Sequence, residues 1–221
     1  MTGSKSVRDL QSLEKGVFVA LEGIDGAGKT TQAFLLKQRV EKEGFEAVCV
    51  KEPTSGPWGQ KIKEIAQRGR KNISLDEELN YFIFDREEDV RDNITPALNR
   101  GSVVIADRYY YSNIAYQSAL GLDPKEIRLR NAKFPVPDLV IIFDISPELG
   151  RLRITDGRSE QANTGYEQLE YLALVKKAYE ALCDSNIVRL DGALDVQTLK
   201  EQVWQKVSAL LTRGAAQTVK E

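Results

Sequence analysis

The stretch Gly23-Ile24-Asp25-Gly26-Ala27-Gly28-Lys29-Thr30-Thr31 decides the fold of this chain. It fits the phosphate-loop pattern G-x-x-x-x-G-K-[ST], follows the apolar run Val17–Leu21 and precedes a helix-like segment, Gln32–Lys42. Glycines allow backbone N–H groups to close around phosphate oxygens, and the following helix presents its positive N-terminal end to the same anion. A strand, a loop and a helix in this order are the context that the motif requires, which counts against a chance match in a glycine-rich turn.

Composition and charge limit the class of protein. The chain has 221 residues, of which 42% are hydrophobic and 29% charged, and its net charge is −2. These values are typical of a soluble globular domain and give no electrostatic footprint for nucleic acid or an anionic membrane. The longest apolar run, Leu139–Phe143, is too short to span a bilayer, and the polar segment Met1–Lys15 lacks the apolar stretch of a signal peptide. We therefore expect a cytoplasmic protein without nucleic-acid or membrane partners.

The cysteine and histidine content limits the kinds of catalytic and metal site that the chain can form. Cys49 and Cys183 lie in apolar or helical segments without metal-ligand spacing, so we expect two buried thiols in a reducing compartment. The chain has no histidine, which excludes a Ser-His-Asp triad, a histidine metal site and histidine acid–base catalysis. Phosphoryl transfer remains open, because it depends mostly on positioning and on charge neutralisation by Lys, Arg, carboxylates and Mg²⁺.

Apolar and β-branched runs alternate with helix-length amphipathic segments. The expected strands are Val17–Leu21, Ala47–Lys51, Ser102–Ala106, Leu139–Asp144 and Ile187–Leu190. The expected helices are Lys29–Glu43, Trp58–Gln67, Leu75–Asn99, Asn113–Leu120, Pro124–Ala132, Pro147–Ile154, Tyr166–Cys183 and Leu194–Leu211. This alternation predicts an α/β fold of the P-loop NTPase type, with a parallel sheet of about five strands and helices on both faces. We expect one domain over 16–213, between a flexible N-terminal extension, 1–15, and a C-terminal tail, 214–221.

Four features follow the carboxyl ends of the predicted strands: the phosphate loop, Lys51-Glu52-Pro53, Asp107-Arg108 and Asp144. Ligands bind outside the carboxyl ends of strands in such sheets, so these features predict a single active site. Within it, Lys29 is expected to reach the β- and γ-phosphates, and the Thr30 hydroxyl to bind Mg²⁺. The Asp107 carboxylate can hold the shell of the same metal, and Arg108 carries a planar fork suited to a phosphate.

Two further groups of residues suggest a base pocket. Asn113, Tyr116 and Gln117 supply donors, acceptors and a ring able to contact a base and a sugar, unless they form an ordinary turn with surface tyrosines. Phe82 and Arg86 are four residues apart on a predicted helix and therefore share one face. A ring that stacks and a cation that bonds a carbonyl make a plausible base pocket, and the alternative is that Phe82 belongs to the core.

Through these motifs the chain resembles the thymidylate kinase (dTMP kinase) family from about Val17 to the C-terminal helix. The resemblance rests on Asp25 within the phosphate loop, the Phe82/Arg86 pair, the pattern D-R-Y-x-x-S-x-x-A-Y-Q over 107–117 and Pro-Val-Pro-Asp-Leu at 135–139. It implies transfer of the ATP γ-phosphoryl group to dTMP, giving dTDP and ADP in dTTP synthesis. It also implies Mg²⁺ as cofactor, dTMP and ATP as ligands, and a homodimer.

The resemblance assigns roles residue by residue. It implies ATP binding by Gly23, Ile24, Asp25, Gly26, Ala27, Gly28, Lys29, Thr30, Thr31 and Arg151, and Mg²⁺ binding by Thr30 and Asp107. It implies dTMP binding by Asp25, Lys51, Phe82, Arg86, Arg108, Asn113, Tyr116 and Gln117. In this assignment Phe82 stacks on thymine, Arg86 bonds a thymine carbonyl and Arg108 holds the acceptor phosphate, while Tyr116 crowds a ribose 2′-hydroxyl.

The family also has a mobile lid over ATP, which would lie at about 151–166 here. Arg151, Arg153 and Arg158 bracket a polar stretch with a glycine, and position 26 is Gly, so the chain resembles the members whose catalytic arginine lies in the lid. Arginines that close on the γ-phosphoryl group neutralise charge in the transition state. The implied catalytic residues are Lys29, Arg108, Arg153 and Arg158. The alternative is that these lid arginines only solvate a loop.

Two departures from the family bear on the acceptor. Lys51-Glu52-Pro53 stands where the family commonly has Arg-Glu-Pro, and Gly165-Tyr166-Glu167 lacks a basic residue that is common at the end of the lid. Lysine keeps the charge of arginine but loses its bidentate geometry. A broader deoxynucleoside monophosphate kinase, a nucleoside kinase and a non-catalytic nucleotide sensor therefore stay as alternatives. A GTPase switch is excluded, since the chain has no N-K-x-D motif.

Overall fold

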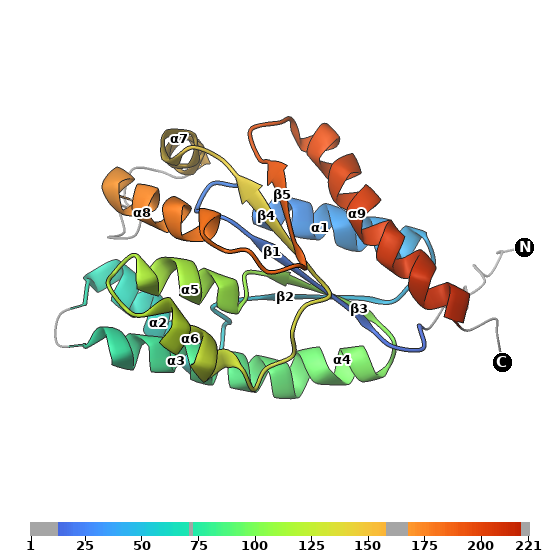
Figure 1. Cartoon of the computed structure of the whole chain (residues 1–221), viewed down its shortest axis with the longest axis horizontal. Coiled ribbons are helices and arrows are strands. Elements are labelled where there is room, and N and C mark those ends of the chain that lie inside the picture. Colours follow the sequence, from blue (N-terminus) through green and yellow to red (C-terminus); the bar gives the residue numbers. More distant parts are fainter. Residues whose placement is uncertain (1–12, 71–72, 158–167, 218–221) are drawn as a thin grey trace, which may run out of the picture.

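The computed structural model describes residues 13–70, 73–157 and 168–217, and at its centre lies one parallel sheet. The sheet has five strands in the order β2-β3-β1-β4-β5 (Figure 1). Their bounds are Val17–Glu22 for β1, Ala47–Lys51 for β2, Val103–Asp107 for β3, Leu139–Asp144 for β4 and Ile187–Asp191 for β5. The residues of β1 and β3 are all buried, as expected of parallel strands that are covered on both faces. The predicted α/β fold is confirmed.

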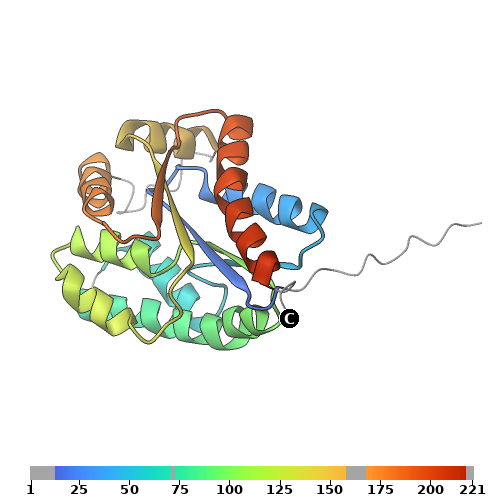
Figure 2. The ribbon, with the colours of Figure 1, turned by 45° about the vertical axis from the view of Figure 1, so that its right-hand side comes forward.

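Helices cover both faces of the sheet. On one face, α1 (Lys29–Lys42) packs against α9 (Val196–Gln217), and Figure 2 shows the two together in blue and red. The other face carries α3 (Leu75–Asp89), the π-helical turn η1 (Val90–Ile94), α4 (Thr95–Asn99), α5 (Tyr110–Ser118), α6 (Pro124–Asn131) and α8 (Leu169–Glu180). The helix α2 (Pro57–Arg68) packs on α3, and α7 (Pro147–Gly157) follows the carboxyl end of β4. No helix in the described ranges is long and apolar enough to cross a membrane.

Local sequence signals set several helix ends. The Ser74 hydroxyl accepts a hydrogen bond from the Glu77 N–H at 3.1 Å, while the Glu77 carboxylate accepts one from the Ser74 N–H at 3.0 Å. This reciprocal capping starts α3. Pro57 and Pro124 begin α2 and α6, where a missing N–H leaves no helical hydrogen bond unmade.

Two expectations are wrong. Cys49 and Cys183 are both exposed rather than buried, because β2 is an edge strand and Cys183 lies just after the end of α8. The helix expected over Leu75–Asn99 is interrupted by the π-helical turn at Val90–Ile94. Pro96 has no N–H for the α-helical bond to the carbonyl four residues earlier, and the helix widens in the turn before it.

Leu13 and the last residues of α9 lie outside the range expected for the domain. Leu13 is 3% exposed, packs in the main hydrophobic core and donates its N–H to the Gly101 carbonyl at 3.2 Å. At the other end, α9 runs to Gln217. Leu13 lies in the segment expected to be a flexible extension, and Gln217 lies in the expected tail.

The burial of helical leucines predicts where stability resides. Leu36 on α1 is 2% exposed and Leu129 on α6 is 70% exposed. Leu36→Ala is expected to lower the free energy of unfolding by about 2–5 kcal/mol, because it leaves a cavity under α1. The matched control Leu129→Ala should change it by less than about 0.5 kcal/mol. Urea unfolding followed by circular dichroism measures both, and equal losses would contradict this account of the core.

Candidate active site

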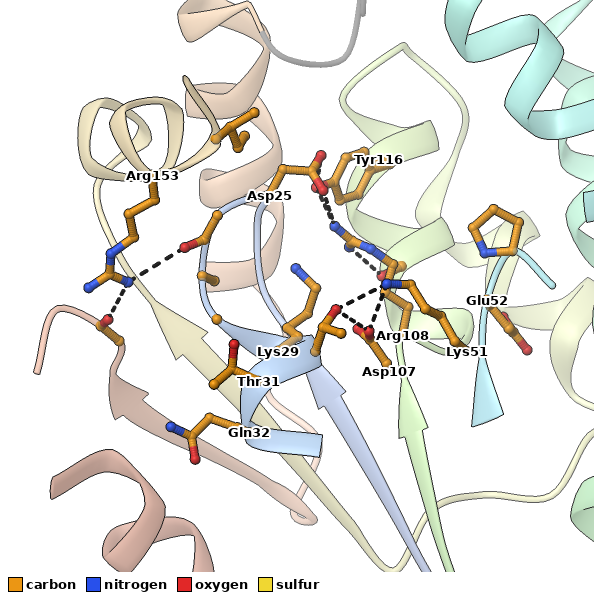
Figure 3. Close-up of a pocket in the computed structure, with 18 of the residues that line it drawn as sticks. Asp25, Lys29, Thr31, Gln32, Lys51, Glu52, Asp107, Arg108, Tyr116 and Arg153 are labelled. Atoms are coloured by element: carbon orange, nitrogen blue, oxygen red, sulfur yellow. Dashed lines mark hydrogen bonds and ion pairs between the residues drawn. The ribbon is translucent and has the colours of Figure 1, made fainter. Parts of the chain in front are cut away.

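The carboxyl ends of β1, β2 and β3 open into one cavity of about 910 Å³ (Figure 3). Three of the four features expected to converge there do so: the phosphate loop, the Lys51-Glu52-Pro53 segment and Asp107-Arg108 all line it. Asp144 does not, since its carboxylate instead pairs with Lys176 of α8. The expectation of one site at this edge holds for the first three features and is wrong for Asp144.

The shape of the phosphate loop depends on its glycines. Gly26 and Gly28 have φ of 79° and 91°, a region that side chains rarely adopt. A Cβ on Gly26 would lie 2.2 Å from the carbonyl oxygen of Gly150, so the loop also packs directly on the backbone of α7. The loop is therefore fixed between the sheet and α7, with the start of α1 directed into the cavity.

Lys29 lies in this loop with little contact with solvent. Its Nζ donates to the carbonyls of Gly23 at 2.9 Å and Ile24 at 2.7 Å, and the residue is 6% exposed. Burial, together with the nearby Arg108 guanidinium, lowers the pKa of Lys29 to about 7. A phosphate entering the loop would favour the charged ammonium and raise this pKa again.

A hydroxyl and a carboxylate meet where α1 begins and β3 ends. The Thr30 Oγ1 donates to Asp107 Oδ2 at 2.5 Å, and the Lys51 Nζ lies 3.0 Å from the same hydroxyl and 3.1 Å from the same carboxylate oxygen. Burial opposes ionisation of Asp107, but the Thr30 hydrogen bond and the neighbouring cations outweigh it and lower its pKa. This edge of the cavity therefore presents an ionised carboxylate beside a hydroxyl.

These two oxygens fit Mg²⁺. Mg²⁺ is commonly held by one or two protein oxygens, with phosphates and water as its remaining ligands. The described residues contain no cluster of three or more acidic, cysteine or histidine side chains that would form an all-protein metal cage. Thr30 and Asp107 thus have the donor chemistry of a metal site that a nucleotide completes.

Arg108 sits in a costly backbone conformation at the centre of the site. Among the described residues it is the single non-glycine with a positive φ, at 76°, which costs roughly 1–2 kcal/mol. Its guanidinium contacts Asp25 at 2.5 Å, the Ser112 hydroxyl at 3.0 Å and the Tyr116 hydroxyl at 3.2 Å. Burial opposes ionisation of Asp25, yet the Arg108 and Lys29 cations lower its pKa. The cation is therefore held in one orientation, facing the cavity.

Glu22 is a functional candidate that the sequence reasoning missed. It ends β1, is 0% exposed and accepts hydrogen bonds from the Ser112 hydroxyl at 2.6 Å and the Tyr179 hydroxyl at 2.9 Å. Burial raises the pKa of Glu22 despite these bonds. Since Ser112 also accepts from Arg108, Glu22 orients the arginine from behind. In the sequence, the feature that could have indicated Glu22 was a glutamate directly after an apolar strand.

Aromatic and amide side chains also line the cavity. Phe82 of α3 and Asn113, Tyr116 and Gln117 of α5 all line it. Asn113 Nδ2 donates to Gln117 Oε1 at 3.3 Å, while the buried Gln117 Nε2 has no hydrogen-bond partner among the described residues. Gln117 therefore brings to the cavity lining a buried donor that is not used by the described residues.

The tyrosines at the start of this segment are not surface residues. Tyr109, Tyr110 and Tyr111 are 0%, 8% and 1% exposed, and α5 begins at Tyr110 rather than at Asn113 as expected. Their rings pack in the core beside Phe18 and one another. The interpretation of this segment as an ordinary turn with surface tyrosines is therefore wrong.

Phe82 and Arg86 do not share the cavity. Arg86 is 0% exposed and does not line it, whereas Phe82 does. The guanidinium forms a two-point ion pair with Glu52 and donates to Asn113 Oδ1 at 2.7 Å and Asn131 Oδ1 at 2.5 Å. Arg86 thus positions two residues of the cavity wall, and its direct contact with a ligand stays a prediction.

The lid arginines have separate positions. Arg153 of α7 lines the cavity and donates to the Gly192 carbonyl at 2.8 Å (Figure 3), whereas Arg151 is exposed on the same helix and does not line it. Arg158 and the other lid residues from 158 to 166 lie outside the described residues. The loop between β5 and α9, residues 192–195, and the first residue of α9 also line the cavity. A 3.1 Å hydrogen bond from Gln32 Nε2 to the Val196 carbonyl joins them to α1. No motif marked that loop or Gln32 in the sequence.

The chain is similar to known proteins over most of their length. A family model described as thymidylate kinase matches residues 21–203. A probable thymidylate kinase of Archaeoglobus fulgidus is 40% identical over 196 residues, covering 88% of this chain and 96% of that protein. Thymidylate kinases of Desulfotalea psychrophila and Xanthomonas euvesicatoria are 38% and 39% identical over 196 residues, covering 89% of this chain and 96% and 85% of those proteins. The chain belongs to the thymidylate kinase family.

Proposed function

We propose that this chain transfers the γ-phosphoryl group of ATP to dTMP, giving dTDP and ADP in dTTP synthesis. The observation that carries the proposal is a single cavity that is lined both by the phosphate loop and by Phe82, Asn113 and Gln117. A donor and an acceptor nucleotide can therefore lie side by side with their phosphates meeting between Lys29 and Arg108. Family membership and the names of the relatives support dTMP as the acceptor.

The donor end would bind ATP through the loop residues Gly23, Ile24, Asp25, Gly26, Ala27, Gly28, Lys29, Thr30 and Thr31, with Arg151 nearby. Backbone N–H groups and the N-terminal end of α1 favour phosphate there. Lys29 would exchange its two backbone carbonyls for phosphate oxygens. Thr30 and Asp107 would hold Mg²⁺, which when bound neutralises charge on the β- and γ-phosphates.

The acceptor end would bind dTMP by its ring and its phosphate. Phe82 would stack on thymine, with Asn113, Tyr116 and Gln117 along the base and sugar. Arg108 and Lys51 would hold the acceptor phosphate, beside Asp25. Arg86 is proposed to act on the base or, from its buried position, through Glu52 and Asn113.

The transfer requires no strong base. An oxygen of the ionised dTMP phosphate forms a bond to the γ-phosphorus while the bond from that phosphorus to the ADP oxygen breaks. The enzyme must bring two polyanions together, and Lys29, Arg108, Arg153 and Arg158 would offset their repulsion. Closure of the lid, about 151–166, would exclude water and limit hydrolysis of ATP. By resemblance to its family, we also propose that the chain acts as a homodimer in the cytoplasm.

The expected acceptor specificity rests on family membership and on the aromatic and amide side chains that line the cavity. We expect turnover with dTMP to exceed turnover with dUMP, dCMP, AMP and thymidine. A coupled ADP-release assay over this panel measures it. Similar rates for several monophosphates would indicate a broader kinase, a preference for thymidine would indicate a nucleoside kinase, and Mg·ATP binding without turnover would indicate a sensor.

Phe82 supplies the expected stacking surface. Phe82→Ala should raise the KM for dTMP about tenfold while changing the KM for ATP little, because base stacking on an aromatic ring is worth roughly 1–3 kcal/mol. Phe84→Ala is the matched control, since Phe84 lies on the same helix, is 39% exposed and packs on Trp58 instead of lining the cavity. An unchanged KM for dTMP in Phe82→Ala would place the base elsewhere.

The lowered pKa of Lys29 predicts proton uptake on nucleotide binding. With a pKa of about 7, Lys29 is mostly neutral at pH 8, and a bound diphosphate favours its charged form. Binding of Mg·ADP at pH 8 should therefore take up close to one proton, and affinity should fall as the pH rises above about 7. Titration calorimetry in buffers of different ionisation enthalpy measures the uptake. Lys29→Arg should abolish it, because arginine stays protonated, whereas buffer-independent enthalpy in the wild type would contradict the prediction.

A further inference from the structure

The last residue of β2 places an ammonium group against both oxygens proposed to bind Mg²⁺. Lys51 Nζ lies 3.0 Å from Thr30 Oγ1 and 3.1 Å from Asp107 Oδ2, and Figure 3 shows Lys51 and Asp107 converging from neighbouring strands. Those two oxygens are 2.5 Å apart, so one ammonium contacts both at once. The ammonium of a lysine of this protein therefore contacts the same two oxygen atoms that would bind a metal.

The backbone dictates this contact. Lys51 and Asp107 are Cα partners in the parallel ladder between β2 and β3, and each is the last residue of its strand. Thr30 is the second residue of α1 and is fixed by the phosphate loop. All three backbone positions belong to the sheet or to the helix that follows it, so only the lysine side chain has to move to break the contact.

The exposed fractions of the two side chains also indicate that Lys51, and not Asp107, is the one able to move. Its side chain is 59% exposed, whereas that of Asp107 is 4% exposed, so the ammonium lies on the open side of a buried carboxylate. A lysine is a strongly hydrated point charge on a flexible stem and can withdraw into solvent at little cost. An arginine could instead cover both carboxylate oxygens with its planar fork.

A metal and this ammonium would compete directly. Mg²⁺ binds oxygen ligands at about 2.0–2.1 Å, closer than an ammonium does, and two cations on one carboxylate oxygen repel each other. Two protein donors alone make a weak Mg²⁺ site, which nucleotide phosphates complete. An internal cation that must be displaced weakens the metal site further until the nucleotide arrives.

We propose that Lys51 is a built-in competitor of Mg²⁺, which neutralises Asp107 in the metal-free protein and withdraws when a Mg²⁺–nucleotide complex binds. Lys51 thereby sets the metal affinity, and it couples metal entry to nucleotide binding. The inference rests on the proposed function, because that function supplies the Mg²⁺–nucleotide complex.

The test measures how strongly Mg²⁺ tightens the binding of ADP. Calorimetry gives the Kd of ADP in EDTA and at saturating Mg²⁺, and their ratio is the metal factor. Lys51→Met removes the competing charge but keeps an unbranched stem, so the metal factor should rise about fivefold over that of the wild type, the scale of a partly exposed ion pair. Lys51→Arg keeps a cation that can cover both carboxylate oxygens, so its metal factor should not exceed that of the wild type.

Lys63→Met is the matched control for charge. Lys63 lines the same cavity, but its Nζ donates to the Thr54 carbonyl at 2.6 Å instead of contacting Thr30 or Asp107. Its removal lowers the positive charge of the cavity equally and should leave the metal factor within about twofold of the wild type, as expected for a screened, exposed charge. An unchanged metal factor in Lys51→Met, or an equal rise in Lys63→Met, would overturn the proposal.

Failure of the proposed function would give a different result. A wild-type protein that binds no ADP, or binds it without any effect of Mg²⁺, would count against the nucleotide and metal sites themselves, and the role of Lys51 would fall with them. Strong Mg²⁺-dependent ADP binding with identical metal factors in the wild type and Lys51→Met would instead overturn the role of Lys51 and leave the proposed function intact.

Discussion

The parallel register of β2, β3 and β1 is the constraint on which the site depends. Asp107 at the end of β3 is the Cα partner of Lys51 in β2 and of Leu21 in β1, so three chain segments leave the sheet in one row. Glu52-Pro53 and Arg108 follow this row directly, and the phosphate loop begins after the last β1 residue, Glu22. A slip of one residue in β3 would turn Asp107 to the opposite face of the sheet and separate it from Thr30.

The charged side chains near these strand ends form two groups, one that faces the cavity and one that lies behind it. Lys29, Arg108, Asp25 and Asp107 face the cavity and balance one another, which keeps both carboxylates ionised in spite of burial. Behind them, Glu22 holds Ser112, and the Arg86–Glu52 ion pair fixes the wall. A buried ion pair is weak support for stability by itself, because desolvation offsets much of the attraction. The contribution of these supporting residues is orientation. They hold the hydrogen-bond donors of the cavity in positions suited to two phosphates, so the donors need not reorganise during transfer.

The sequence predicted the regular elements closely where hydrophobic runs end at clear signals. The ranges of β2 and β4 agree with the expected strands, and the strand before the phosphate loop differs by one residue. The start of α5 was misjudged because Tyr110 and Tyr111 pack into the core, which periodicity in so short a segment does not reveal. The exposure of Cys49 depends on β2 being an edge strand, and strand order is not encoded in the pattern of any one strand.

Some properties of the site were determined by the sequence, and others were decided by the tertiary structure. The sequence by itself determined the fold class, the phosphate loop and the positions of Asp107 and Arg108 at the end of a strand, because these features depend on local sequence. Tertiary structure alone decided that Arg86 turns away from the cavity to Glu52, that Glu22 supports Arg108, and that Lys51 caps the Thr30–Asp107 pair. Each of these contacts joins segments that are distant in the chain. A buried charge needs a partner, and the register of the strands decides which partner lies close enough.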